Sequence, residues 1–260
     1  TQTTAALEDG QWRINGAKEF ITNSGTDITS LVTVTAVTGT VEGRTGHDGR
    51  PAKEISTILV PAGTEGFSVA KAYDKVGWNS SDTHALHFTD ARVPEENLLG
   101  ARGRGFAHFL EILDEGRIAI AALATGAAQG CVDESVAYAK QRTSFGQKIG
   151  QFQAVSFKIA RMQARAHAAR LAYYEAAQKM LAGKPFKTEA AMAKLIAGEA
   201  AMDNARDAIQ VFGGYGFMNE TLVARHYRDS KILDIFEGTQ QIQQLIIARR
   251  VLGKSSADLK

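Results

Sequence analysis

The sequence predicts an α+β protein: a small antiparallel β-sheet or barrel domain followed by an up-down four-helix bundle. The first hundred residues hold short segments rich in β-branched residues, and glycine-rich turns separate them. Beyond residue 100, apolar and small residues recur at alternating steps of three and four, the spacing of one face of a helix. We therefore predict a β domain over residues 1–100 and a helical domain over residues 101–260.

Composition excludes several classes of protein. The 260 residues are 44% hydrophobic and 22% charged, with a formal net charge of +2. These values are those of an ordinary globular protein, and such a charge gives no global field toward nucleic acid or anionic membrane. The single cysteine, Cys131, excludes a disulfide framework within one chain, and the six scattered histidines show no metal-ligand spacing. We expect no nucleic-acid, membrane or metal partner, and a core position for Cys131.

Five segments of the first domain have the character of strands. Gln11–Ile14 precedes Asn15-Gly16, a pair typical of a tight turn. The other four predicted strands are Leu31–Thr38, Ile55–Val60, Phe67–Ala70 and Ala85–Phe88. Gly39–Glu54 is rich in glycine and charge, so we expect a long, mobile hairpin loop there. No glycine-rich dinucleotide fingerprint follows any of these strands, and a Rossmann site is not expected.

The second domain is predicted to be helical throughout. Residues 106–113 lead, after Gly116, into a long alanine-rich helix that ends near Gln141. Two further helices, centred on residues 152–173 and 191–212, are separated at Gly183–Pro185. Glycines 213 and 214 end the second of these helices, a short piece lies near residues 225–231, and the last helix spans Gln240–Leu252 and closes at Gly253. Long helices with small residues along their seams and short loops between them favour a bundle.

The stretch Ile232–Gln244 holds the first candidate for chemistry. An apolar run leads to Glu237, Gly238 breaks the run, and Thr239 can cap the helix that follows. A lone carboxylate among apolar residues is a candidate proton-transfer base, because burial raises its pKa toward neutrality. The alternative is a solvated Glu237, or one that accepts hydrogen bonds from the first amides of the helix.

Three other patches have a structural and a functional interpretation each. Arg142 at a helix C-terminus can favour the helix dipole or, with Gln153, hold a phosphate. The glycines of Gln210–Gly216 can form a flexible helix end or admit a flat or phosphorylated ligand close to the backbone. Asp114 and Arg117 stand three apart on one helix face, and their structural interpretation is a simple surface ion pair.

Six motifs occur in an order that resembles the acyl-CoA dehydrogenases, over the whole chain. They are Phe20–Asn23, Gly77–Pro94, Asp114 with Arg117, Arg142–Gly146 with Phe152-Gln153, Gln210–Gly216 and Phe236–Thr239. A β domain followed by a helical bundle agrees with the middle and C-terminal domains of that family.

The resemblance implies a flavoenzyme that binds FAD and an acyl-CoA. A glutamate removes the Cα proton, the flavin accepts a hydride from Cβ, and a trans-2-enoyl-CoA is left. Electrons then leave to an electron-transfer flavoprotein. Such enzymes serve β-oxidation and fatty acid metabolism, commonly as homotetramers, so we expect a dimer or tetramer. The implied location is the cytoplasm, or the mitochondrial matrix in a eukaryote.

The resemblance also assigns roles to single residues. Glu237 matches the catalytic base, and Gly238 the residue beside the thioester, with Asp114 and Arg117 on the helix that contacts CoA. The residues matched to FAD contacts are Phe20, Ile21, Thr22, Arg142, Gln153, Gln210, Val211, Phe212, Gly213, Gly214, Thr239, Gln240 and Gln241. Some relatives carry the base just before the arginine of the Asp-x-x-Arg motif, where this chain has Gly116, so Glu237 is the better candidate.

Other readings and one departure stand beside this interpretation. On the same fold the chain can be a decarboxylating dehydrogenase or a flavin oxidase, and from another class it can be a non-catalytic helical interaction module. The family has an N-terminal helical domain, and a segment entering the sheet, that this sequence does not match. We therefore expect the chain to be a fragment that does not, alone, hold FAD tightly or turn over.

Overall fold

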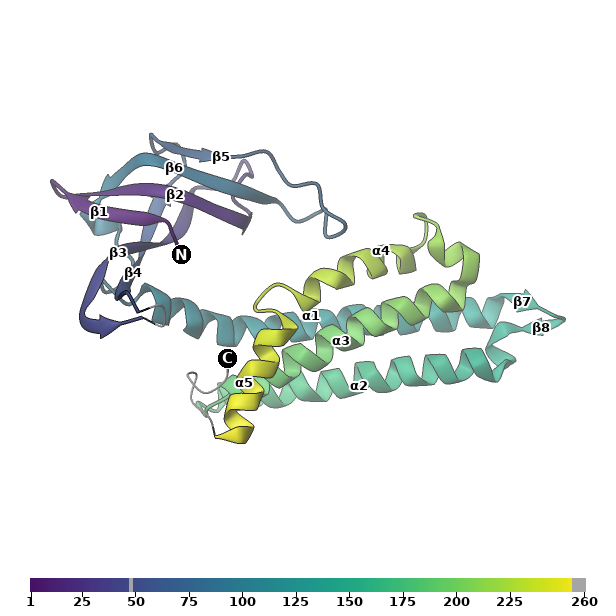
Figure 1. The fold of residues 1–260 in the computed structure, drawn as a ribbon. Coiled ribbons are helices and arrows are strands. Elements are labelled where there is room, and N and C mark those ends of the chain that lie inside the picture. The colour runs from purple at the N-terminus through teal and green to yellow at the C-terminus, as the bar shows by residue number, and fades with distance from the viewer. Residues whose placement is uncertain (47–48, 254–260) are drawn as a thin grey trace. The chain divides into compact units, whose positions relative to one another are not determined.

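The computed structural model describes residues 1–46 and 49–253, and these form two compact units. Unit 1 comprises Thr1–Lys75 and Asn79–Glu111, and unit 2 comprises Val76–Trp78 and the chain from Ile112 onward. Unit 1 is a sheet and unit 2 is helical (Figure 1). The predicted division between residues 100 and 101 stays a prediction.

Unit 1 contains a six-stranded sheet in the order β4-β3-β1-β2-β6-β5. Its strands are β1 Thr4–Glu8, β2 Gln11–Thr22, β3 Leu31–Thr45, β4 Pro51–Pro61, β5 Phe67–Val69 and β6 Thr83–Pro94. Neighbours pair antiparallel except β1 and β3, which run parallel through Thr4 and Val37. The sheet is therefore mixed rather than purely antiparallel, and the predicted α+β class is unchanged. Alternate residues of β3, such as Val32 and Val34, are buried, as expected for a half-buried strand.

Two local predictions in the sheet are wrong. Asn15-Gly16 lies inside β2 at a register shift, and the turn between β1 and β2 is made by Asp9 and Gly10, both with positive φ. Most of the predicted loop 39–54 belongs to β3 and β4, which extend to Thr45 and from Pro51. Its residues 47 and 48 lie outside the described residues. Cross-strand pairing outweighs the low strand propensity of glycine and charged residues here.

The described residues of unit 2 form four long helices and one short one. They are α1 Gly105–Gln141, whose first turns belong to unit 1, α2 Gln153–Leu181, α3 Lys187–Phe212, α4 Leu222–Ser230 and α5 Gln240–Leu252. The ribbon β7 Thr143–Ser144 and β8 Gln147–Lys148 joins α1 to α2, and 3-10 turns lie at Glu95–Asn97, Ile149–Gln151, Gly213–Phe217 and Lys231–Asp234. The predicted stop signals at Gly183, Gly213 and Gly253 are confirmed, each with positive φ.

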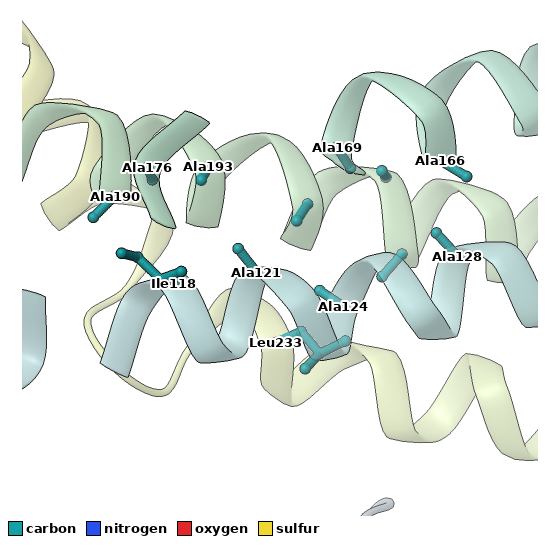
Figure 2. Close-up of a cluster of buried hydrophobic side chains, with 13 residues drawn as sticks. Ile118, Ala121, Ala124, Ala128, Ala166, Ala169, Ala176, Ala190, Ala193 and Leu233 are labelled. Carbon is teal, nitrogen blue, oxygen red and sulfur yellow. The ribbon is translucent and has the colours of Figure 1, made fainter. Parts of the chain in front are cut away.

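The core of unit 2 consists largely of alanine. Figure 2 shows Ala121, Ala124 and Ala128 of α1 facing alanines of α2 and α3, with Leu233 nearby. Such small side chains let the helices pack closely. The amide of buried Asn204 on α3 donates to carbonyls of Ala128 on α1, at 3.1 Å, and of Met162 on α2, at 2.9 Å. One side chain thereby ties three helices together.

Residues 1–46 and 49–253 contain neither a membrane-spanning helix nor a cluster of metal-binding side chains. In that part of the chain, none of the helices has the length and apolar character needed to cross a bilayer. The same residues contain no group of three or more His, Cys, Asp or Glu side chains placed to hold a metal ion.

Candidate functional site

The first site is the turn between the 3-10 turn at Lys231–Asp234 and α5. Glu237 and Gly238 are consecutive residues with left-handed backbone, at φ +53° and +92°. A glutamate in this region is uncommon, and such strained positions persist where the surrounding structure holds them. The hydroxyl of Thr239 then accepts from the Ile242 amide at 3.4 Å and caps α5, as predicted. The turn fixes where the Glu237 carboxylate points.

Gly116 on α1 lies directly against this carboxylate. A methyl group at Gly116 would stand 2.6 Å from Oε2 of Glu237, closer than real side chains approach. The missing side chain at position 116 therefore makes the room that the Glu237 carboxylate occupies. Positions 116 and 237, the two alternative places for the catalytic base, therefore lie in direct contact.

Arg117, the next residue of α1, is buried and forms an ion pair with Asp114. The predicted alternative of a surface ion pair is wrong, because the Arg117 side chain is only 4% exposed. One of its terminal nitrogens lies 3.9 Å from the point where a Cβ on Gly238 would stand. Arg117 is therefore part of the wall beside the Glu237 turn. Contact of Asp114 or Arg117 with CoA stays a prediction.

The electrostatics suit a proton acceptor. Burial raises the pKa of Glu237 above its ordinary value, and the positive charges of Arg117 and Lys194 oppose that rise. In the described part of the chain, the carboxylate has no side-chain hydrogen bond and no ion pair within 4.0 Å. A partly buried carboxylate with no internal partner is free to accept a proton from a ligand. Among the described residues no helix amide donates to this carboxylate, so that alternative does not fit the geometry, whereas a partly solvated Glu237 does.

Sequence reasoning missed Gln243, which holds the turn from inside. Its buried side-chain amide donates to the Gly238 carbonyl at 2.9 Å and to the Glu237 carbonyl at 3.3 Å. Lys194 on α3 was missed as well, although it is fully buried near Glu237. A charged residue within the apolar seam of an alanine-rich helix was the available signal for Lys194.

A second site in unit 2 brings together five residues predicted to contact the cofactor. A cavity of about 450 Å³ is lined by Arg142, Val211, Phe212, Gly213 and Gly214, with Tyr138 and Tyr215 among its other walls. The Arg142 guanidinium lies 5.8 Å from the centre of the Tyr215 ring, and Tyr138 stacks on Phe212 at 4.1 Å. No atom comes within 4 Å of where a Cβ on either glycine would stand. A cation, aromatic faces and open backbone suit a flat group that carries phosphate.

The remaining predicted contacts in unit 2 lie elsewhere. Gln210 lines a neighbouring cavity of about 540 Å³, and Gln153 is exposed at the start of α2. The Gln240 amide points inward and donates to the Leu195 carbonyl at 3.1 Å, while Gln241 is exposed. The structure does not gather these residues around the cavity at Arg142, and their contact with a cofactor stays a prediction.

Phe20, Ile21 and Thr22 belong to unit 1 and end β2. The register of β2 against β6 shifts between Lys18 and Ile21, and Phe20 has φ +60°. The bulge turns the Phe20 side chain outward, 73% exposed, against Tyr73 at 5.3 Å between ring centres. A flat aromatic ligand can stack on such a surface.

Two family models match the chain. The model described as acyl-CoA dehydrogenase, middle domain, matches residues 1–91. The model described as acyl-CoA dehydrogenase, C-terminal domain, matches residues 103–252.

A curated relative and two solved structures show how far the likeness extends. The short-chain-specific acyl-CoA dehydrogenase of Megasphaera elsdenii is 42% identical over 245 residues, 94% of this chain and 61% of the relative. The structure of butyryl-CoA dehydrogenase from the same organism is 41% identical with a TM-score of 0.88, over 96% of this chain and 63% of that one. A structure described as the electron transferring flavoprotein of Acidaminococcus fermentans is 40% identical with a TM-score of 0.89, over 98% and 64%. The chain therefore spans less than two thirds of the length of each.

Proposed function

Because the chain belongs to the acyl-CoA dehydrogenase family, we propose that the intact protein oxidises an acyl-CoA thioester to a trans-2-enoyl-CoA. The observation that carries this proposal is the Glu237 turn. A carboxylate without an internal partner stands on a strained backbone, with a raised pKa and a glycine opposite it.

The chain's own residues account for removal of the Cα proton. The Glu237 carboxylate accepts that proton, and its partial burial makes it a stronger base than a solvated carboxylate. A Cβ on Gly238 would stand 2.7 Å from Nε2 of Gln243, so the absence of a side chain at position 238 leaves room for the amide that holds the turn. Gln243 fixes the carbonyls of both residues, so the carboxylate is oriented before substrate arrives.

FAD is the cofactor that the family implies, and the residues of each unit fit it. In unit 2, Arg142 and the open backbone of Gly213 and Gly214 suit a pyrophosphate, and Tyr215 offers an aromatic face beside them. In unit 1, the exposed ring of Phe20 and the backbone of Ile21 and Thr22 suit the edge of a flavin ring. When bound, FAD supplies the acceptor for the hydride from Cβ.

Replacement of the base tests this function. In the intact protein loaded with FAD, Glu237→Gln is expected to abolish dye-linked dehydrogenation, because an amide accepts no proton. Fold and bound FAD are expected to persist, as checked by circular dichroism and the flavin absorbance. In the unsubstituted enzyme, kcat/KM is expected to fall with acid along a limb whose midpoint lies above pH 4.5, since burial raises the pKa of Glu237. Undiminished turnover of Glu237→Gln would sink the assignment.

A short acyl chain is the substrate class that the relatives support. The curated relative is named short-chain specific and the solved structure is named butyryl-CoA dehydrogenase. Spectral titration with a ladder of acyl-CoA lengths should show the tightest binding and fastest flavin bleaching at about four carbons. A maximum at long chains would contradict this part of the proposal.

The proposed function also implies an electron acceptor and an oligomeric state for the intact protein. We propose that an electron-transfer flavoprotein takes the electrons and that the intact protein is a homo-oligomer serving β-oxidation. The similar structure described as an electron transferring flavoprotein supports the first of these two proposals.

Three observations would indicate the alternative functions. Oxygen consumption without an added acceptor would indicate a flavin oxidase, and release of CO₂ would indicate a decarboxylating dehydrogenase. A colourless intact protein would indicate a non-catalytic module.

A further inference from the structure

Lys194 presents an unusual charge in the interior of unit 2. It lies on α3, in a segment whose Ala193 and Ala197 belong to the core, and its side chain is completely buried. Within residues 1–46 and 49–253, its ammonium has no hydrogen-bond partner and no ion pair within 4.0 Å. Burial of a cation without a partner is strongly unfavourable, so its charge must be offset through space.

Among the described residues, three charged groups from three elements act on the Lys194 ammonium through space. In decreasing order of effect they are Asp234 in the 3-10 turn Lys231–Asp234, Arg117 on α1, and Glu237 in the turn that follows Asp234. The helix α5 contributes the buried, uncharged side chains of Gln240 and Gln243. Arg117 repels the Lys194 ammonium, so the attraction has to come from the two acids.

Only one of these acids lacks a partner of its own. Asp234 bonds the Lys231 ammonium at 2.9 Å and the Gln240 amide at 3.2 Å, and Arg117 is paired with Asp114. In the described residues, the Glu237 carboxylate has neither kind of partner. Lys194 is therefore a buried cation without a partner, and Glu237 is a partly buried anion without one.

The backbone of α3 is packed closely against the segment that carries Glu237. The Leu195 carbonyl accepts from the Gln240 side chain at 3.1 Å. A Cβ on Gly198, one turn beyond Lys194, would stand 3.1 Å from the Leu233 carbonyl and 3.3 Å from Oδ1 of Asp234. The helix that carries Lys194 is thus packed against the segment that leads into the Glu237 turn.

We propose that Lys194 is a positioning residue whose buried ammonium, together with Arg117, favours the ionised form of Glu237 and so influences the pH range in which this base works. The proposal rests on Glu237 being the base of the proposed reaction. Burial lowers the pKa of Lys194 to about 8, so its ammonium stays predominantly charged over the acidic range in which Glu237 titrates. The charge acts on the Glu237 carboxylate and does not need to touch substrate.

The test compares pH profiles of the intact, FAD-loaded protein. Lys194→Met keeps a side chain of similar length and removes the charge. Without that charge the Glu237 pKa rises, so the acid limb of kcat/KM should move to higher pH. Below the limb the activity of the variant is then lower than that of the unsubstituted enzyme, and well above the limb the two match.

The matched control is Lys179→Met on α2. Lys179 carries the same charge but pairs with Glu175 and Glu189. Its profile should be unchanged. A residue that only fills space would lower activity equally at every pH, so an unshifted acid limb in Lys194→Met overturns the proposal.

A double-mutant cycle on unfolding provides a second readout that needs no turnover. The free energy of unfolding in urea is compared for the unsubstituted protein, Lys194→Met, Glu237→Gln and the double variant at pH 7. Attraction between the two charges predicts that Lys194→Met is less destabilising when Glu237 is already Gln. Additive effects contradict the proposal. Should Lys194→Met fail to fold, Lys194→Gln enters both experiments in its place.

The two proposals fail in different ways. If Glu237→Gln retains turnover, the assignment of the base is wrong, whatever Lys194 does. If Glu237→Gln is inactive but the acid limb of Lys194→Met stays in place, only the inference on Lys194 is wrong.

Discussion

At the scale of single residues, the site depends on backbone conformation and on one missing side chain. Glu237 stands in a left-handed conformation that costs about 1–3 kcal/mol for a residue other than glycine. Gly116 on another helix leaves the space into which its carboxylate fits. The left-handed backbone therefore directs the Glu237 carboxylate to a place where α1 has no side chain.

This arrangement predicts a sharp effect from one methyl group. In the intact protein, Gly116→Ala should lower kcat by about 10- to 100-fold, because the added carbon displaces the Glu237 carboxylate. The fold should persist, since alanine favours a helix over glycine by about 1 kcal/mol. Steady-state kinetics and thermal unfolding measure the two effects.

Gly126 on the same helix is the matched control. No atom comes within 4 Å of where its Cβ would stand. Gly126→Ala should therefore stabilise the protein by about 0.5–1 kcal/mol and leave kcat unchanged. Equal activity of the two alanine variants would show that Gly116 does not shape the site.

At the scale of elements, α2 and α3 are joined by a polar contact that helical periodicity alone does not reveal. Lys158, Arg161 and Arg165 form a basic stripe along α2, a pattern typical of a solvated helix face. In the structure, Lys158 and Arg165 reach Asp207 on α3, at 3.2 Å and 2.7 Å. Asp207 is 8% exposed, so these two partly exposed members of the stripe also serve the helix contact.

This contact makes stability depend on pH. Burial alone would raise the pKa of Asp207, but the hydrogen bonds from Arg165 and Lys158 outweigh it, so the pKa lies below its ordinary value of 3.8. A lowered pKa in the folded state adds stability above about pH 4 that is lost as pH falls through the folded pKa. Asp207→Asn should therefore cost about 2 kcal/mol at pH 7, and less near pH 3, in urea unfolding.

Asp203 on α3 serves as the comparison for Asp207. It also contacts Arg165, at 3.7 Å, but its side chain is 40% exposed. Asp203→Asn should cost less than about 1 kcal/mol because water screens exposed ion pairs. A cost equal to that of Asp207→Asn would contradict the role assigned to burial.

At the scale of the whole molecule, the single thiol reports on unit 2. Cys131 packs with residues of α2, α3 and α4, among them Met162, Ala205 and Val223. Burial raises the pKa of this thiol to about 12. The predicted core position of Cys131 is confirmed.

We expect Cys131 to be unreactive until the bundle opens. With a disulfide reagent at pH 8, the folded protein should react at least about a hundredfold more slowly than the protein in denaturant, because the thiol is neither ionised nor accessible. The reaction is followed by absorbance. Rapid reaction of the folded protein would show that the four helices around Cys131 do not pack as described.

The sequence predicts most elements and few of their partners. Helix ends at Gly183, Gly213 and Gly253 are local, because glycine alone relieves the strain of a left-handed residue. Strand partners are not local, so Asn15-Gly16 is read as a turn although β6 pairs across it, and the loop 39–54 conceals the ends of β3 and β4. The parallel pairing of β1 with β3 leaves no mark in either segment.

The sequence by itself determined the α+β class, the helical bundle and the resemblance to the acyl-CoA dehydrogenases, and it predicts Glu237 rather than position 116 as the base. These follow from periodicity, stop residues and ordered motifs, all carried by neighbours along the chain. Only the tertiary structure decided that Gly116 faces Glu237, that Gln243 holds the turn and that Lys194 is fully buried. Those contacts join α1, α3 and α5, and the energies that place a charge in the interior arise only once the helices have packed together.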